Sequence, residues 1–209
     1  VAKGKLDAMV DVEETKDESR PNTIILEFAV KPNDRVKVED VKFVGNTKFS
    51  DRKMRKKMKN TKRKGTLFRK TKFVEDDYEE DKKSIIAFYN NNGYKNARIV
   101  SDSVYREKDG DIIAEIVIEE GNPFFYRTIS WKGNSLYTDE QLNNVLGIGK
   151  GDVYNPELLE NRLRFSQDGR DISSYYLDDG YLGFSVDPVE IAVENDSVDI
   201  EMRIFEGPQ

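Results

Sequence analysis

The stretch Val41-Lys-Phe-Val-Gly-Asn-Thr-Lys-Phe-Ser-Asp51 returns 88 residues later as Ile129-Ser-Trp-Lys-Gly-Asn-Ser-Leu-Tyr-Thr-Asp139. Aliphatic residues align with aliphatic residues, aromatic with aromatic, and Gly-Asn stands at the same place in both copies. Self-similarity at a fixed spacing is the signature of a chain built from copies of one structural unit. This repeat therefore decides how the rest of the chain is divided.

The repeat extends well beyond these two stretches. Phe88-Tyr89 through Gly93-Tyr94 matches Tyr175-Tyr176 through Gly180-Tyr181, and Ile118-Glu-Glu-Gly121 matches Ile204-Phe-Glu-Gly207. A third copy is present only as its end, because Ile24–Val30 alternates like Ile112–Ile118. We therefore divide the chain into three parts: the closing hairpin of a preceding repeat at 1–35, and complete units at 36–121 and 122–209.

Each complete unit opens with a strand and a short helix. The strand alternates apolar and polar residues and ends at Gly-Asn, since both residues tolerate the positive φ of a turn. The helix begins after Ser50 or Thr138 as N-cap, and Thr138 with Gln141 forms a capping box. Its apolar positions lie four residues apart: Met54 and Met58 in one unit, Leu142 and Leu146 in the other.

A second helix and a hairpin complete the unit. The helix carries an apolar stripe at helical spacing and ends at Gly93 or Gly180 as a left-handed cap. In the last unit, 167–170 is expected to interrupt it. Turns at Asp109-Gly110, Asn195-Asp196 and, in the incomplete copy, Pro21-Asn22 join the two closing strands. The order β-α-α-β-β predicts an α+β fold of tandem small domains, each a three-stranded mixed sheet covered on one face by two helices.

The composition narrows the classes of function. The chain has 209 residues with a net charge of −6, and it contains neither cysteine nor histidine. Disulfides and thiolate metal sites are excluded, and the commonest general base and metal ligand are missing. Gly147–Gly151 lacks the spacing of a phosphate-binding loop and follows a helix. We expect no catalytic residue, no cofactor and no bound metal, although an enzyme with an unrecognised carboxylate site stays open as an alternative.

Two further features of the composition bear on partners. The negative charge argues against nucleic acid. No apolar run approaches the roughly 18 residues that a membrane-spanning helix needs, so a membrane anchor is expected outside this fragment.

The order of elements, the strand–Gly-Asn–Ser/Thr helix start and the helix ending in Gly-Tyr resemble a POTRA (polypeptide-transport-associated) domain, over nearly the whole chain. Tandem POTRA domains precede the membrane barrel in outer-membrane protein-assembly factors and their relatives. The segments Tyr176–Leu182 and Phe205–Pro208 are similar to those of such factors from Bacteroidetes-type bacteria. The loop at 60–73 and the interruption at 167–170 are longer than a minimal POTRA domain requires.

This resemblance implies a non-catalytic, polypeptide-binding arm at the periplasmic face of the outer membrane. Its partners would be unfolded outer-membrane proteins and periplasmic lipoproteins or chaperones, with the membrane reached through a barrel outside this fragment. Two alternatives stay open: a structural spacer that holds partner proteins, and the POTRA arm of a secretion or import transporter.

Binding is expected at sheet edges, where unpaired main-chain groups can pair with another extended chain. The resemblance implies that the first strand of each closing hairpin is such an edge, at 97–105, 184–193 and, in the incomplete copy, 6–12. The candidate binding residues are Ala97, Ile99, Ser101, Ser103, Tyr105, Phe184, Val186, Val189 and Ile191.

A basic stretch precedes the second helix of the first complete unit, and acidic residues at 75–81 follow it. The two blocks can neutralise each other on a solvated face, and acidic residues favour the start of a helix. Alternatively, the loop docks on anionic lipid head groups or an acidic partner, with Leu67 and Phe68 at its tip. The candidate residues of such a loop are Lys62, Arg63, Lys64, Arg69, Lys70 and Lys72.

Overall fold

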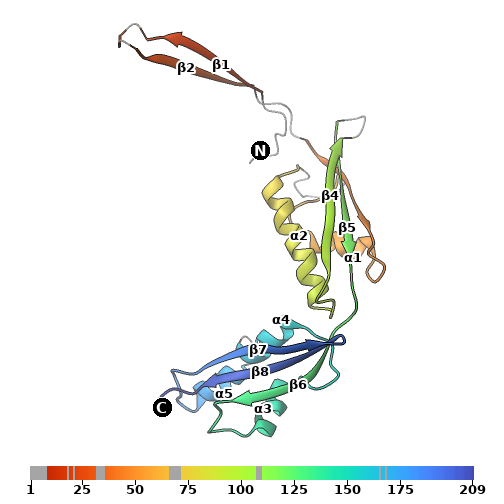
Figure 1. Ribbon diagram of the computed structural model, residues 1–209, viewed down its shortest axis with the longest axis vertical. Helices are drawn as coiled ribbons and strands as arrows, with labels where there is room; N and C mark the ends of the chain where they lie inside the picture. The colour runs from red at the N-terminus through yellow and green to blue at the C-terminus, as the bar shows by residue number, and fades with distance from the viewer. Residues whose placement is uncertain are drawn as a thin grey trace. The chain divides into compact units, whose positions relative to one another are not determined.

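The computed structural model describes residues 9–17, 19–20, 22–31, 36–65, 72–106, 110–164, 166–167 and 169–209. The described elements are β1 (Met9–Lys16), β2 (Ile24–Lys31), β3 (Val38–Val44), α1 (Asp51–Lys57), α2 (Glu75–Asn90), β4 (Arg98–Arg106), β5 (Ile112–Glu119), β6 (Phe125–Lys132), α3 (Asp139–Leu146), α4 (Pro156–Arg164), α5 (Ile172–Asp178), β7 (Ser185–Glu194) and β8 (Ser197–Phe205) (Figure 1). By contacts the chain forms two compact units, one of residues 1–85 and 99–118 and the other of residues 86–98 and 119–209.

The first unit contains the hairpin of β1 and β2. The two strands are antiparallel, with Met9 opposite Lys31 and Lys16 opposite Ile24. Their apolar side chains, among them Val12 and Phe28, are exposed. The predicted edge strand at 6–12 is described only from Met9 onward, and it continues to Lys16.

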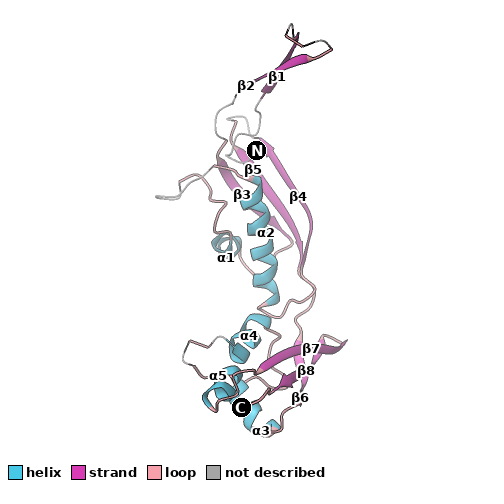
Figure 2. Cartoon of the chain, turned by 90° about the vertical axis from the view of Figure 1, so that its left-hand side faces the viewer, coloured by secondary structure: helices cyan, strands magenta, loops and turns pink. Residues whose placement is uncertain are grey.

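The remainder of the first unit holds a three-stranded sheet in the order β3-β5-β4. The central strand β5 runs parallel to β3. The helices α1 and α2 lie on one face of this sheet (Figure 2). There Met54, Tyr78 and Ile85 are buried together with the inward residues of β5. This arrangement confirms the predicted α+β fold.

The second unit repeats the same design with the sheet order β6-β8-β7. Here β6 is parallel and β7 antiparallel to the central β8. The predicted interruption is confirmed, because α4 ends at Arg164 and α5 begins at Ile172 with Asp171 as its N-cap. Leu142, Leu146 and Trp131 lie in the core of this unit.

The helix ends follow the sequence signals with one exception. Thr138 and Gln141 form the predicted capping box. Ser50 stands at the N-cap of α1, but its side chain makes no capping hydrogen bond, so that expectation is only partly met. After α2, the amides of Gly93 and Tyr94 donate to the carbonyls of Asn90 and Tyr89. After α5, the amides of Gly180 and Tyr181 donate to the carbonyls of Leu177 and Tyr176. These are Schellman caps, in which the Gly at positive φ reverses the chain.

The hairpin between β7 and β8 turns at Asn195 and Asp196, both at positive φ, as a two-residue primed turn requires. None of the described helices is long and apolar enough to cross a membrane.

Candidate functional site

The two three-stranded sheets have four outer strands, β3, β4, β6 and β7, because β5 and β8 are central. An outer strand leaves one row of main-chain N–H and C=O groups without a sheet partner. Such a row can accept another extended chain, unless the protein already covers it. We therefore compare, for each outer strand, which of these main-chain groups the protein itself already covers in the described structure. A polypeptide can pair only with an edge that is left uncovered.

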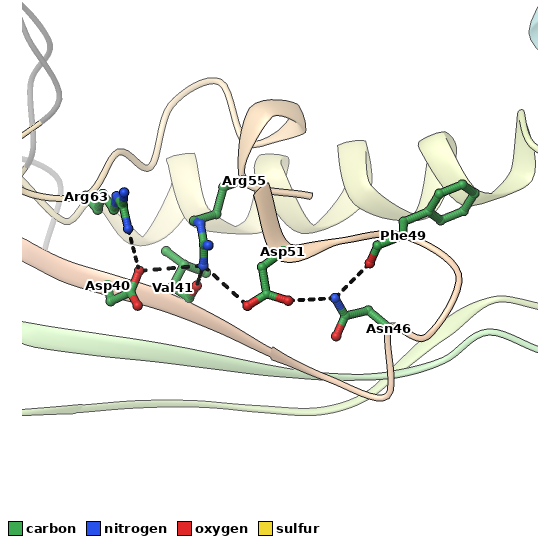
Figure 3. Close-up of polar contacts among 7 residues, drawn as sticks. All are labelled: Asp40, Val41, Asn46, Phe49, Asp51, Arg55 and Arg63. Carbon is green, nitrogen blue, oxygen red and sulfur yellow. Dashed lines mark hydrogen bonds and ion pairs between the residues drawn. The ribbon is translucent and has the colours of Figure 1, made fainter. Parts of the chain in front are cut away.

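The outer edge of β3 is covered from its start to Val41. Two carbonyls of the strand and that of Val36, just before it, accept hydrogen bonds from elsewhere in the unit: Val36 from the Phe73 amide at 3.0 Å, Val38 from the Lys64 amide at 2.7 Å, and Val41 from the Arg55 guanidinium at 2.9 Å (Figure 3). The pairing of β3 with β5 shifts register between Val38 and Asp40, which explains the uneven spacing of these outward carbonyls.

The outer edge of β6 is covered by the segment 151–154. The Tyr126 carbonyl accepts from the Gly151 amide at 2.7 Å, and its amide donates to Asp152 at 2.9 Å. The Tyr154 amide donates to the Phe124 carbonyl at 2.9 Å. The start of β6 is thus already paired with the protein's own main chain.

The edge of β7 is interrupted in three ways. The Arg164 guanidinium donates to the Val186 carbonyl. Pro188, two residues further on, has no N–H to offer a partner. The register against β8 then shifts between Glu190 and Ala192, so that Ile191 forms a bulge. Proline and bulges are the devices by which natural sheets prevent strand addition at an edge.

The edge of β4 lacks the proline and the side-chain cover of β7 in the residues that the structure describes. Residues 98–105 contain no proline or glycine, and all of them except the half-buried Ile99 are exposed. Within this range no side chain bonds to the main chain of the strand. Among the four outer strands, β4 therefore presents the most open described edge for another strand.

A cavity of about 330 Å³ lies beside this edge, between β4 and the start of α2. It is lined by Phe73, Glu75, Tyr78, Glu79, Asp102, Val104, Tyr105, Arg106 and Ile112. Side chains alternate across a strand, so a chain added to β4 would direct every second side chain to the helix-covered face on which this cavity opens.

The polar groups of this cavity are partly neutralised within the unit. Lys82 of α2 binds Asp102 of β4 at 3.1 Å and Glu79 at 2.7 Å. The Tyr78 hydroxyl is buried and makes no hydrogen bond of normal geometry in the described structure. Burial and the nearby Asp102 carboxylate raise the pKa of Tyr78 well above its ordinary value, so the hydroxyl keeps its proton. The protonated Tyr78 side chain is part of the lining of the cavity.

The structure places the predicted edge residues unequally. Ser101, Ser103 and Tyr105 are exposed on β4, Ile99 is half-buried, and Ala97 is buried just before the strand. On the other sheet Phe184 precedes β7 and stacks on Tyr176 at 4.1 Å between ring centroids, Val186 is buried, Val189 is half-buried, and Ile191 is exposed at the bulge.

Three residues of β4 that line the cavity, Asp102, Val104 and Arg106, were missing from the sequence-based set. The period-two alternation of the strand could have identified them, since they lie on the face opposite to Ser101 and Ser103.

Part of the predicted basic loop is described. Lys64 forms ion pairs with Asp111 at 3.0 Å and Glu39 at 3.5 Å, and Arg63 lies 3.8 Å from Asp40. The main chain of Lys72 pairs with that of Lys37 in an isolated antiparallel β-bridge. Lys62 donates to the Met58 carbonyl. Arg69 and Lys70, with Leu67 and Phe68, lie outside the described residues.

Comparison with known proteins gives the following matches. A family model named POTRA, described as "Surface antigen variable number repeat", matches residues 36–121 and 124–207. The chain is 26% identical to the outer membrane protein assembly factor BamA of Neisseria meningitidis over 99% of its own length and 26% of that protein. It is 25% identical to a putative outer membrane protein assembly factor of Treponema pallidum, over 89% of this chain and 22% of that one. The chain thus spans about a quarter of the length of these relatives.

Solved structures share the fold. The POTRA3-5 crystal structure of Haemophilus influenzae BamA matches 97% of this chain and 74% of that one, with a TM-score of 0.53 and 15% identity. BamA from Haemophilus ducreyi lacking POTRA domains 1-3 matches 80% of this chain and 29% of that one, with a TM-score of 0.54 and 16% identity.

Proposed function

The chain belongs to the POTRA family of domains, and from that premise we propose that it forms part of the periplasmic arm of an outer-membrane protein-assembly factor of the BamA type. In this role it receives unfolded outer-membrane proteins and accessory factors by strand addition, and passes them on for insertion. The relatives from Neisseria and Treponema, which carry the name of assembly factors, support this assignment. The proposed function requires no catalytic group.

One observation carries the binding mechanism, namely the open edge of β4. Strand β3 up to Val41, the start of β6, and β7 are occupied or interrupted. Residues 98–105 of β4, all exposed except the half-buried Ile99, lack such cover in the described structure. Main-chain pairing depends little on side chains, which suits a protein that meets many different extended segments. The cavity beside Tyr78 and Val104 adds a place for one side chain of the incoming strand.

An NMR titration tests this mechanism. The isotope-labelled chain is titrated with an extended peptide from a strand of an outer-membrane barrel, and with the same peptide N-methylated at alternate amides. We expect saturable shifts concentrated at residues 98–105 with the first peptide and none with the second. The N-methylated peptide keeps its side chains but loses the donors that strand addition requires.

Matched variants separate the two candidate edges. Ser101→Lys with Ser103→Lys places charges on β4, which is how natural edges repel a partner strand. This double variant is expected to lose the shifts, whereas Val189→Lys with Ile191→Lys on β7 should keep them. Equal loss from both variants would refute the assignment to β4.

The alternatives predict other outcomes of the same titration. A structural spacer gives no saturable shift at millimolar peptide. Electrostatic docking on the basic loop gives shifts confined to residues 60–65 and 72–73, and these shifts decrease as salt is added.

A further inference from the structure

A second cavity lies on the other side of the first unit, where α1 and the segment that follows it meet β3. Its volume is about 380 Å³. Five cationic side chains line it, Arg52, Arg55, Lys56, Lys62 and Arg63, together with Thr61. This cavity is separate from the β4 edge and its neighbouring cavity, because the two share no lining residue.

Three of the cations have structural partners nearby, and Lys62 is the one that donates to the Met58 carbonyl. Arg55 donates to the Val41 carbonyl and lies 3.4 Å from Asp51 and 3.7 Å from Asp40 (Figure 3). Arg63 also approaches Asp40, at 3.8 Å. These contacts hold the guanidinium groups at the cavity and use the two carboxylates that lie closest to them.

The remaining charge of the cavity exceeds what these carboxylates neutralise. Arg52 and Lys56 stand one helical turn apart on the exposed face of α1, and in the described ranges neither takes part in an ion pair or hydrogen bond. The cavity therefore combines two anchored guanidinium groups with two cations that extend from the helix.

Thr61 supplies an independent sign of a ligand. The residue is only 4% exposed, yet its hydroxyl has no hydrogen-bond partner among the described residues. Its amide, in contrast, is held by the buried Asp81 carboxylate of α2. A buried hydroxyl without a partner is costly, and most such groups are satisfied by a ligand or water when the chain itself offers nothing.

The second unit shows that the fold does not require these charges. Its equivalent cavity, of about 500 Å³, has two cations in its lining, Arg127 and Lys150, beside Asn143, Asn144 and Gly149. At the spacing of the repeat, Asn143 and Asn144 stand where the first unit has Arg55 and Lys56, and Gly149 stands where it has Thr61. Arg127 there is paired with Asp199 at 2.6 Å and with Glu194 at 3.3 Å. The same place in the same fold thus holds two cationic side chains where the first unit has five, and one of the two is paired.

From these observations we infer that the cavity around Thr61 binds a phosphate group, with Arg52, Lys56 and the guanidinium of Arg63 as charged contacts and the Thr61 hydroxyl as a donor. Guanidinium groups match the oxygens of phosphate in geometry and charge, and the cavity has room for a single head group. The phosphate belongs either to a lipid head group or to a soluble phosphate compound, and both present the same chemistry.

An NMR titration with inorganic phosphate at constant ionic strength tests the inference. We expect saturable shifts of the amides of residues 60–65. Thr61→Val keeps the shape of the side chain and should weaken binding about tenfold, as the loss of a hydrogen bond to a charged group does. Arg52→Gln with Lys56→Asn, which leaves the buried core unchanged, should weaken it at least as much. Lys42→Gln with Lys83→Gln removes the same charge outside the cavity and should change the affinity less than about twofold.

Co-sedimentation with phosphatidylglycerol vesicles separates the two sources of phosphate. Vesicle binding that Thr61→Val weakens assigns the group to a lipid, whereas phosphate binding without vesicle binding assigns it to a soluble compound. The inference is overturned if phosphate produces no saturable shift, or if the control double variant weakens binding as much as Arg52→Gln with Lys56→Asn. Neither result would affect the proposed strand addition at β4, which is measured at residues 98–105.

Discussion

Gly45 and Gly133 each end the first strand of a sheet at positive φ, 86° and 89°. A Cβ atom at either position would lie 2.1 Å from a carbonyl oxygen, that of Ile118 or that of Ile204. The sequence pattern predicted the turn at both glycines. It could not show the second constraint, because the neighbouring strand comes from the far end of the same unit.

Gly133→Ala should therefore destabilise the second unit by at least about 2 kcal/mol, since it adds a close contact with main chain to an unfavourable φ. Urea unfolding followed by circular dichroism measures the change. Gly149→Ala is the matched control, because a Cβ there meets nothing within 4 Å. A similar loss of stability in both variants would contradict the argument.

The side chain of Glu206, just after β8, bonds both the loop that follows β6 and helix α5. Its carboxylate accepts from the amides of Ser135 and Leu136 at 2.8 and 2.9 Å, and from the Tyr176 hydroxyl at 3.3 Å. Burial alone would raise the pKa of Glu206, but these hydrogen bonds outweigh it and lower the pKa below its ordinary value. The first repeat, at 36–121, holds an equivalent pair, Tyr89 and Glu120, at 2.8 Å.

The lowered pKa sets the sign of a pH dependence. The ionised Glu206 stabilises the fold above its unfolded pKa of about 4.3, and this contribution is lost as the pH falls through the lower folded pKa. Glu206→Gln keeps the size of the side chain but removes the titrating group. Urea midpoints measured between neutral and acidic pH should therefore fall less steeply for the variant than for the wild type. Parallel curves would show that Glu206 does not contribute.

At the scale of elements, two edge strands are each covered in part by an arginine from a helix of the same unit. Arg55 of α1 bonds the outward Val41 carbonyl of β3, and Arg164 of α4 bonds the Val186 carbonyl of β7. The two arginines are not equivalent in the repeat, because one lies on the first helix of its unit and the other on the second. Both reduce the number of main-chain groups that another strand could use.

Arg164→Gln with Pro188→Val should open the β7 edge, because it frees the Val186 carbonyl and restores an N–H at position 188. We expect the double variant to acquire peptide-induced NMR shifts at 185–190, or to self-associate in sedimentation velocity. Arg162→Gln with Pro188→Val restores the N–H but leaves Arg164 in place, so it should show a smaller effect. No change in either measurement would mean that the bulge at Ile191 closes this edge by itself.

The sequence predicted the elements better than their edges. The order β-α-α-β-β, the interruption before Asp171 and the helix ends at Gly93 and Gly180 followed from local patterns, and the structure confirms them. The cover of β3 and β6 depends on main-chain contacts from segments distant in sequence, at 63–64 and 151–154. Side-chain patterns do not encode such contacts. The sequence alone therefore does not show which of the candidate edges is open.

At the scale of the whole molecule, the boundaries of the compact units differ from those of the sequence repeats. Residues 86–98 follow the pattern of the first repeat, but by contacts they belong with residues 119–209. The Gly93 carbonyl accepts from the Phe124 amide at 2.8 Å, and Lys95 binds Glu190 at 2.7 Å. Helix α2 therefore begins in one compact unit and ends in the other. The repeat boundary at 121/122 stays a prediction.

This position of α2 predicts coupling between the units. Leu142→Ala removes a fully buried side chain from the second core and should cost about 2–5 kcal/mol. Because a helix forms cooperatively, loosening the end of α2 should also speed amide hydrogen exchange in its first half, at 78–85. Leu158→Ala, at an exposed position of α4, is the control and should leave those amides unchanged. If Leu142→Ala speeds exchange only from residue 86 onward, the two halves of α2 open independently, and each compact unit unfolds without the other.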